Sequence, residues 1–424
     1  MNKNIRGWIV TFSGTGINLA LGVLYTWSVF AAALTEQLGW TKTAASLPYT
    51  IACAVFAIMM VPGGRLQDRF GPRWVATAGG IFAGGGLLLS SLTNSLFILT
   101  ITFGLIAGIG IGLGYSAATP AAVKWFPPEK KGLISGIVVA GFGLASLYIA
   151  PMTNAFIGNF GIKGAFRIEG LIFLVAIVCL SQLLATPLTP AQSSSKTKNS
   201  SSSTSQTAAS QTASTVQPSL SPVSPASKTD FTWQEMLKDP RFYVLWLMFA
   251  FGATAGLMII GQLSTITKLQ TGIAWGYAMV ALLAIFNAGG RVLAGWLSDR
   301  IGRSWTMRIF FCLQGFNMLA FALYTNPALI ALGAVITGLS YGSLLSLFPS
   351  ATYDFFGTKN GGVNYGLVFT AWGVGGVIGP LMAGKVVDLT NSYFYAYLIA
   401  ATLCLVAALL TIFLRKKASL ENVS

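Results

Sequence analysis

Twelve apolar runs follow one another along the chain, and each is long enough to cross a lipid bilayer. A helix of about 20 apolar residues spans a hydrocarbon core of roughly 30 Å. Charged residues make up only 9% of the 424 residues, against about 25% in soluble proteins. We therefore predict an all-α membrane protein with twelve transmembrane helices. The runs lie near residues 7–34, 43–64, 74–93, 97–122, 132–157, 167–186, 241–267, 274–297, 305–325, 327–350, 361–387 and 391–414.

The placement of the basic residues predicts how the chain lies in the membrane. A net charge of +15 would suit a nucleic-acid-binding protein if the charges formed one block. Here the lysines and arginines gather at both termini and in short loops after the even-numbered runs, as the cytoplasmic loops of membrane proteins do. We expect a multi-pass protein of the cytoplasmic (inner) membrane with both termini in the cytoplasm, active as a monomer and without a nucleic-acid partner.

A polar segment divides the runs into two sets of six. Most of residues 187–240 is rich in Ser, Thr, Gln and Pro, a composition that cannot bury a core. We predict a largely disordered cytoplasmic linker that joins an N-terminal six-helix bundle, residues 1–186, to a C-terminal six-helix bundle, residues 241–424. A plain tether is the simplest role for the linker, and regulation by phosphorylation is the alternative.

The two sets of runs resemble each other. GGRLQDRFGPRW (63–74) is echoed by AGWLSDRIGRSW (294–305), and WFPPEKKGLISG (125–136) is echoed more weakly by FFGTKNGGVNYG (355–366). Each segment follows the run of the same number in its own half. Duplication of a six-helix unit is typical of secondary transporters, which bind their substrate where the two repeats meet. The sequence therefore predicts two pseudo-symmetric bundles with a substrate site between them.

The first pair of echoes contains the pattern G-x-x-x-D-R-x-G-x-R twice. It resembles the loop motif of the major facilitator superfamily, and the two copies follow the second and eighth runs. The aspartate can cap a neighbouring helix N-terminus while the arginines pair at the cytoplasmic interface. Positive charge in cytoplasmic loops would explain the arginines but not the repeated glycine and aspartate spacing. We predict a gating motif made of Gly64, Asp68, Arg69, Arg73, Gly295, Asp299, Arg300 and Arg303.

Within that superfamily the chain resembles the oxalate/formate antiporter family, whose relatives include bacterial and animal monocarboxylate transporters. The resemblance implies a transporter of small carboxylates that is coupled to a proton or to a counter-anion. It covers nearly the whole chain apart from the linker. The matching segments are GVLYTWSVF (22–30), GLGYSAATPAAVKWFP (112–127), RFYVLW (241–246), NAGGRVLAGWLSDRIGR (287–303), LFPSATYDFFG (347–357) and NYG (364–366).

Arg291 is the one basic residue that lies clearly inside an apolar run. It precedes Asp299 by eight residues, or about 12 Å of helix, and a charge at such depth costs at least ~2.5 kcal/mol. We expect no carboxylate partner inside the membrane, because every acidic residue near the runs falls at a run end or in a loop, Glu169 included. Guanidinium binds a carboxylate through two parallel hydrogen bonds, so we predict that Arg291 binds the substrate. Snorkelling towards the interface is the alternative.

Neighbouring residues complete the predicted site. Asn287 lies four residues before Arg291 and therefore on the same helical face, where its amide can orient the guanidinium or donate to the substrate. Animal monocarboxylate transporters tend to have an aspartate at the matching position. The resemblance also places aromatic side chains around the substrate, and for each of them simple packing is the alternative. These are Tyr25, Tyr115, Phe142, Tyr341, Phe369 and Trp372.

One departure from the family pattern bears on the substrate. The oxalate transporter of the family has a lysine at the position of Trp372, which supplies a second cation for a dianion. A single buried cation balances a monoanion, so we predict transport of lactate, pyruvate or formate. Oxalate/formate-type anion exchange is the alternative.

The runs contain no Ser–His pair, metal-ligand cluster or paired carboxylates. We therefore expect no enzyme activity and no cofactor or metal. A nutrient sensor with a transporter fold would need a soluble signalling domain.

Overall fold

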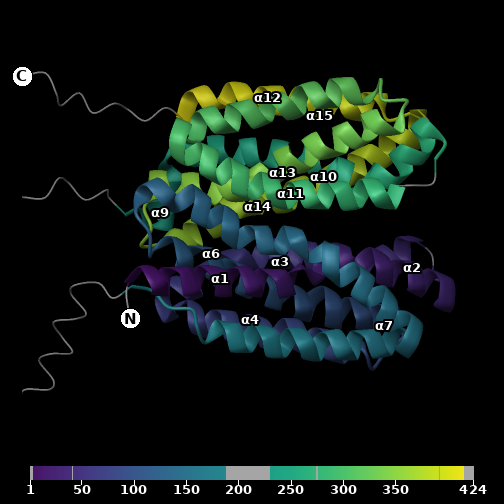
Figure 1. Ribbon diagram of the computed structural model, residues 1–424, viewed down its shortest axis with the longest axis horizontal. Coiled ribbons are helices and arrows are strands. Elements are labelled where there is room, and N and C mark those ends of the chain that lie inside the picture. Colours follow the sequence, from purple (N-terminus) through teal and green to yellow (C-terminus); the bar gives the residue numbers. More distant parts are fainter. Residues whose placement is uncertain (1–2, 41, 188–229, 274–275, 391, 415–424) are drawn as a thin grey trace, which may run out of the picture.

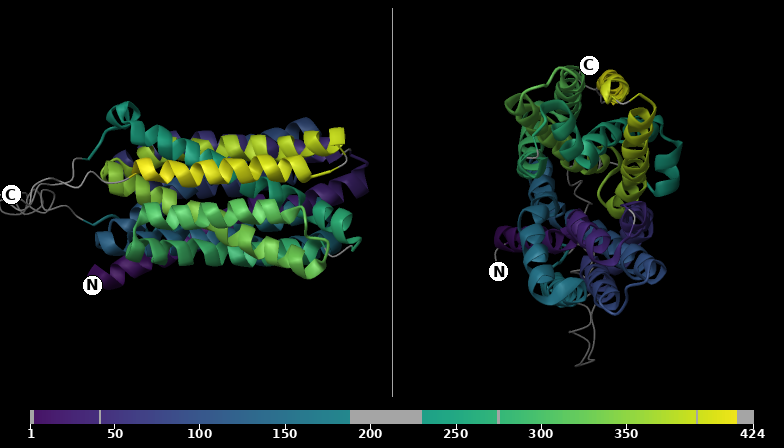
Figure 2. Two further views of the ribbon diagram at one scale, coloured as in Figure 1. Left: turned by 90° about the horizontal axis from the view of Figure 1, so that it is seen from above. Right: turned by 90° about the vertical axis from the view of Figure 1, so that its right-hand side faces the viewer.

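The computed structural model describes residues 3–40, 42–187, 230–273, 276–390 and 392–414. Its helices run along one long axis and form two bundles that lie side by side (Figures 1 and 2). We call the end of the long axis that holds α9 and the start of α1 the α9 end; it is on the left of Figure 1. The predicted all-α fold with two helical bundles is confirmed.

The first bundle contains all the elements up to the linker. These are α1 (Lys3–Leu21), η1 (Gly22–Thr26), α2 (Trp27–Leu38), α3 (Lys42–Phe70), α4 (Pro72–Ser90), α5 (Leu96–Leu99), η2 (Thr100–Ala107), α6 (Gly108–Val123), η3 (Pro128–Lys130) and α7 (Lys131–Ser181). The second bundle follows the short α9 (Trp233–Lys238). It contains α10 (Pro240–Thr271), α11 (Gly276–Ile301), α12 (Arg303–Phe321), α13 (Pro327–Phe356), α14 (Gly361–Thr390), α15 (Phe394–Leu410) and η4 (Thr411–Leu414).

The described ranges contain nine helical segments that are long and apolar enough to cross a membrane. One of them, Pro128–Ser181, holds two crossings, because α7 bends at Gly161, where φ is 70° and ψ is 174°. Glycine adopts this conformation without the steric penalty of a side chain. The shorter α4 and α12, with 19 residues each, bring the number of crossings to the predicted twelve.

Helix ends differ from the prediction at the repeated motif. The predicted runs stop at residues 64 and 297, but α3 and α11 continue to Phe70 and Ile301. Each copy of the motif is therefore mostly helical, and only its second glycine forms the turn, with φ of 86° at Gly71 and 87° at Gly302. Hydropathy marks where the apolar surface ends. It does not mark where the backbone hydrogen bonds of a helix end.

The last part of the predicted linker is ordered, while residues 188–229 lie outside the described ranges. Thr232 and Glu235 form a capping box at the start of α9, which satisfies two free N–H groups of the first turn. Asp230 accepts hydrogen bonds from the backbone of Thr358 and Lys359, in the turn between α13 and α14. The chain is therefore anchored to the second bundle from Asp230 onwards, within the last part of the predicted linker.

Candidate functional site

The two bundles meet along two pairs of helices, α7 with α11 and α3 with α14, and we call this contact the seam. A Cβ atom added to Gly64 would lie 2.1 Å from the Gly362 carbonyl oxygen, and one added to Gly295 would lie 2.2 Å from the Gly132 carbonyl oxygen. No side chain fits at such distances. The first glycine of each predicted gating motif therefore allows the backbones of opposite bundles to touch at the α9 end.

Both motif aspartates cap helices of the opposite bundle. Asp299 accepts hydrogen bonds from the backbone N–H groups of Gly132 (3.0 Å) and Leu133 (2.8 Å), at the start of α7. Asp68 accepts the equivalent bonds from Gly362 (3.3 Å) and Val363 (3.0 Å), at the start of α14. A carboxylate is stabilised by the positive end of a helix dipole. These contacts tie the bundles together at the α9 end in a pseudo-symmetric way.

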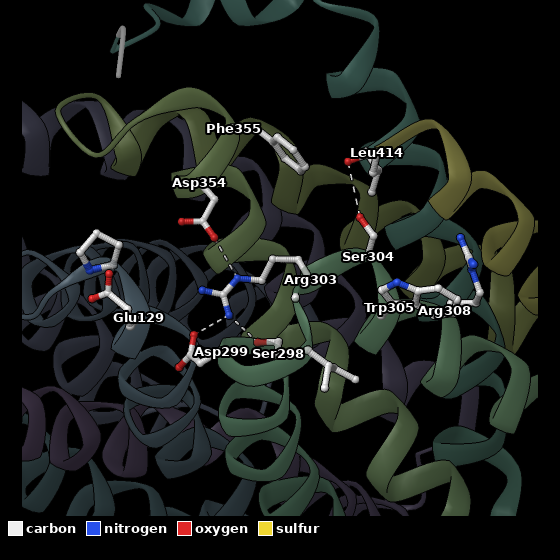
Figure 3. A pocket seen from close by; sticks show the side chains of 13 residues that line it. Glu129, Ser298, Asp299, Arg303, Ser304, Trp305, Arg308, Asp354, Phe355 and Leu414 are labelled. Atoms are coloured by element: carbon white, nitrogen blue, oxygen red, sulfur yellow. Dashed lines mark hydrogen bonds and ion pairs between the residues drawn. The ribbon is translucent and has the colours of Figure 1, made fainter. Parts of the chain in front are cut away.

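The motif arginines behave less uniformly than predicted. Arg303 pairs with Asp299 (2.6 Å) and with Asp354 (2.9 Å), which Lys131 approaches at 3.6 Å. Figure 3 shows Arg303 between these two carboxylates, beside a cavity of about 620 Å³. In the other half, Asp68 pairs at 3.7 Å with Lys124, which is not a motif residue.

The other three motif arginines contact aromatic rings or an amide. Arg69 and Arg300 lie over the rings of Phe70 (5.2 Å) and Trp296 (4.0 Å), and Arg73 donates to Gln182 (2.7 Å). These three arginines are exposed on the outer faces of their helices. The helical periodicity turns them away from the seam, and an aromatic ring or an amide is then the available partner.

Arg291 lies at the seam and is completely buried. Its Nε donates to the Asn287 side-chain oxygen at 3.2 Å, and its Nη1 donates to the Val139 carbonyl of α7. Its Nη2 has no hydrogen-bond partner. The guanidinium thus extends from the second bundle to the first, and Gly143 leaves room for it, since a Cβ atom there would lie 3.1 Å from the Arg291 Cζ.

No carboxylate among the described residues lies within ion-pair distance of Arg291. The predicted position of Glu169 at a run end is nevertheless wrong. Glu169 is completely buried inside α7, where it accepts a hydrogen bond from Thr153. Because α7 bends at Gly161 without ending, Glu169 falls two turns inside the helix that follows the bend.

Four of the predicted aromatic residues form one buried cluster across the seam. Tyr115 and Phe142 come from the first bundle, with ring centroids 5.3 Å apart, and Phe369 and Trp372 come from the second, at 5.1 Å. Tyr115 and Phe369 join the two pairs at 5.6 Å. All four side chains are at most 4% exposed. The rings of both bundles therefore pack on one another and leave almost none of their surface exposed.

The other two predicted aromatic residues have different positions. Tyr341 of α13 accepts a hydrogen bond from the Trp372 indole N–H at 2.7 Å. This bond fixes the orientation of the Trp372 ring. Tyr25 lies in η1, but its side chain lies outside the described part of the structure, and its predicted role stays a prediction.

Sequence reasoning missed three members of this region. Phe56 of α3 contacts Tyr115, Phe142, Phe369 and Trp372, with ring centroids 5.3–5.9 Å apart. Phe56 lies in an unbroken apolar run, and nothing in the sequence distinguishes it from the packing residues around it.

Tyr365 and Tyr353 are the other two missed residues. They are 2% and 1% exposed, and neither hydroxyl has a hydrogen bond of ordinary geometry. A buried hydroxyl without a partner costs about 1–3 kcal/mol. The polar neighbours of Tyr365 include the Tyr115 hydroxyl and the Arg291 guanidinium. The NYG segment (364–366), which is part of the family resemblance, is the one sequence feature that could have identified Tyr365.

Comparisons with known proteins extend over most of the chain. The sequence profile of the Major Facilitator Superfamily matches residues 10–380 and, in an overlapping match, residues 265–424. The oxalate:formate antiporter of Oxalobacter formigenes is 30% identical over 401 residues, which cover 92% of this chain and 87% of that protein. Monocarboxylate transporter 2 of Homo sapiens is 26% identical over 378 residues, or 84% of this chain and 75% of that protein.

Solved structures agree on the fold. FucP, a transporter of the same superfamily in the outward conformation, superimposes with a TM-score of 0.69 at 13% identity, and the match covers 97% of this chain and 100% of that chain. These matches agree with the resemblance drawn from the repeated motif.

Proposed function

Since the chain belongs to the Major Facilitator Superfamily, we propose that it is a secondary active transporter of small monocarboxylates such as lactate, pyruvate or formate. The observation that carries this proposal is the state of Arg291. It is completely buried, it has no carboxylate partner among the described residues, and its Nη2 is unpartnered. A buried charge needs a counter-charge to be stable, and a substrate carboxylate supplies one.

The position of Arg291 at the seam gives the bound carboxylate a role in the transport cycle. The guanidinium belongs to α11 of the second bundle but already donates to the Val139 carbonyl of α7 in the first. A carboxylate that binds Nη2 neutralises the charge while the two bundles move against each other. Alternating access needs such a shared site between repeats. We propose that Asn287, which holds Nε, fixes the direction in which the guanidinium points.

We propose that the α9 end faces the cytoplasm and that the structure is closed on that side. The positive-inside distribution of lysine and arginine supports this orientation. The helix caps of Asp68 and Asp299 and the glycine contacts all lie between the α9 end and the central aromatic cluster. The gating residues would accordingly hold the cytoplasmic side shut.

Charge and cluster composition support a monoanion over a dianion. Two relatives of this chain are an oxalate:formate antiporter and a monocarboxylate transporter, and both names refer to small carboxylates. In this chain Arg291 is the one cation of the described central region, and Trp372 packs on Phe369 within the cluster. Oxalate would leave one negative charge uncompensated there. Oxalate/formate-type exchange is the second candidate, because the antiporter is 30% identical to this chain.

We expect lactate and pyruvate to compete for uptake at least tenfold better than oxalate. Exchanging Trp372 for lysine adds a cation to the cluster and should improve oxalate competition at least tenfold. The measurement is uptake of labelled lactate by purified protein in lipid vesicles, with each unlabelled acid as competitor. Trp372→Gln is the matched control, since it removes the ring and adds no charge. Better competition by oxalate than by lactate in the unmodified protein would overturn the charge argument.

We propose proton symport as the coupling mode, with the proton entering together with the substrate. Uptake of labelled lactate into vesicles with and without internal lactate, each run with and without a pH gradient, tests this. Symport predicts that an inward proton gradient drives accumulation. Strict exchange predicts that accumulation requires an internal carboxylate and is insensitive to the pH gradient.

A further inference from the structure

Two buried tyrosines occupy the region between the substrate site and the α9 end. Tyr353 lies near the end of α13 and Tyr365 near the start of α14, and their rings are 6.3 Å apart in an edge-to-face arrangement. Neither hydroxyl has a hydrogen bond of ordinary geometry, although both side chains are almost completely inaccessible. A protein interior seldom leaves such groups unsatisfied, so these two hydroxyls call for an explanation.

Their positions follow the long axis of the molecule. Tyr353 comes twelve residues after Tyr341 on α13, or about 18 Å closer to the α9 end, and Tyr365 comes seven residues before Trp372 on α14, or about 10 Å closer. Tyr365 interacts electrostatically with Arg291 and Tyr115, and Tyr353 with Tyr115 and Asp68. The two hydroxyls therefore lie between the central guanidinium and one of the helix-capping aspartates.

The two tyrosines also lie beside the part of the seam that must separate. Gly366 follows Tyr365, and a Cβ atom there would lie 2.3 Å from the Met60 carbonyl oxygen of α3. Gly362 contacts Gly64 on the same pair of helices. Opening of the α9 end, which alternating access requires, would move α14 away from α3 along this line. The Tyr353 and Tyr365 hydroxyls would then face the new opening.

We propose that the Tyr353 and Tyr365 hydroxyls form a second binding position for the substrate carboxylate, on the α9 side of Arg291, which is occupied when the seam between α3 and α14 opens. The proposal rests on the function proposed above. A carboxylate that leaves Arg291 loses its counter-charge, and two hydroxyl donors replace part of that stabilisation without a second buried cation. Hydroxyl donors hold a carboxylate more weakly than a guanidinium does, which suits a position on the way out.

The test is to remove the hydroxyls and keep the rings. The variants are Tyr353→Phe, Tyr365→Phe and the double variant, reconstituted in lipid vesicles. The matched control is Tyr397→Phe, because Tyr397 is equally buried, at 2% exposure, and its hydroxyl also lacks a partner. Tyr397 packs against Phe321 inside the second bundle, away from the seam. Phenylalanine fits each of these sites without a new contact.

We expect the double variant to transport lactate about tenfold more slowly, each single variant to lie in between, and the control to match the unmodified protein. Lactate affinity, measured by quenching of tryptophan fluorescence, should change less than twofold, because Arg291 still supplies the first position. Unchanged transport by the double variant, or equal slowing by the control, would overturn the second position alone. If the unmodified protein transports no carboxylate, or if Arg291→Ala transports normally, the proposed function fails and the second position fails with it.

Discussion

Replacing Arg291 by alanine should abolish saturable lactate uptake while leaving the protein inserted and folded. Loss of one partner of a buried, hydrogen-bonded charge pair costs about 2–5 kcal/mol, which lowers affinity by roughly 30-fold to several thousand-fold. The folded protein should tolerate the change, because alanine removes an uncompensated buried charge and the Val139 carbonyl remains part of a helix. Uptake in vesicles and the elution profile of the detergent-solubilised protein measure the two effects separately.

Two further variants separate charge from geometry. Arg291→Lys keeps the charge but lacks the planar fork that contacts both Asn287 and α7, so we expect at least a tenfold loss of affinity. Arg167→Ala is the control, because Arg167 is an exposed arginine of α7, and it should transport normally. Saturable uptake by the Arg291→Ala variant with an unchanged KM would exclude Arg291 as the carboxylate ligand.

The double variant Asp68→Asn with Asp299→Asn should lose most of its transport activity and should favour the conformation open at the α9 end. Each carboxylate accepts two backbone hydrogen bonds from a helix start of the opposite bundle. Asparagine keeps one acceptor and loses the charge. If the two changes together cost about 3 kcal/mol of closing free energy, the ratio of open to closed molecules rises roughly 100-fold.

Accessibility of the seam measures this shift. Met60 of α3 lies against Gly366 of α14 and is completely buried, so a cysteine introduced at Met60, with the four native cysteines replaced, reports opening by its rate of labelling with a maleimide. We expect much faster labelling in the double variant. Glu129→Gln serves as the control, because Glu129 is an exposed carboxylate of the same region. Equal labelling rates in all three proteins would show that the caps do not hold the seam closed.

The sequence predicted the features that depend on a single unusual residue in an apolar context. Arg291 and Asn287 could be identified because a charge and an amide four residues apart stand out in an apolar run, and the structure hydrogen-bonds them to each other. The repeated glycine and aspartate spacing indicated the two bundles and the capping aspartates. Such signals come from composition and spacing along one helix.

Features that depend on which helices contact each other could not be predicted from the sequence. Phe56 and Tyr365 lie in segments where most residues are apolar or small, so no periodicity separates the side that faces the seam from the side that packs within the bundle. The partner of each motif arginine depends on helix rotation, so the sequence could not show that Arg303 lies between two carboxylates while Arg69 and Arg300 lie over aromatic rings. Glu169 was misplaced because a bend at one glycine looks like a loop in the sequence.

The two pairs of helices at the seam carry different sets of charges, although the capping bonds are equivalent. On the side of α7 and α11, Asp299, Arg303, Asp354 and Lys131 form a connected network, and Arg291 adds a bond to α7. On the side of α3 and α14, the one ion pair of Asp68 with a described residue is that with Lys124, which belongs to its own bundle. We therefore expect α3 and α14 to move apart when the bundles separate, while α7 and α11 stay in contact and act as the hinge.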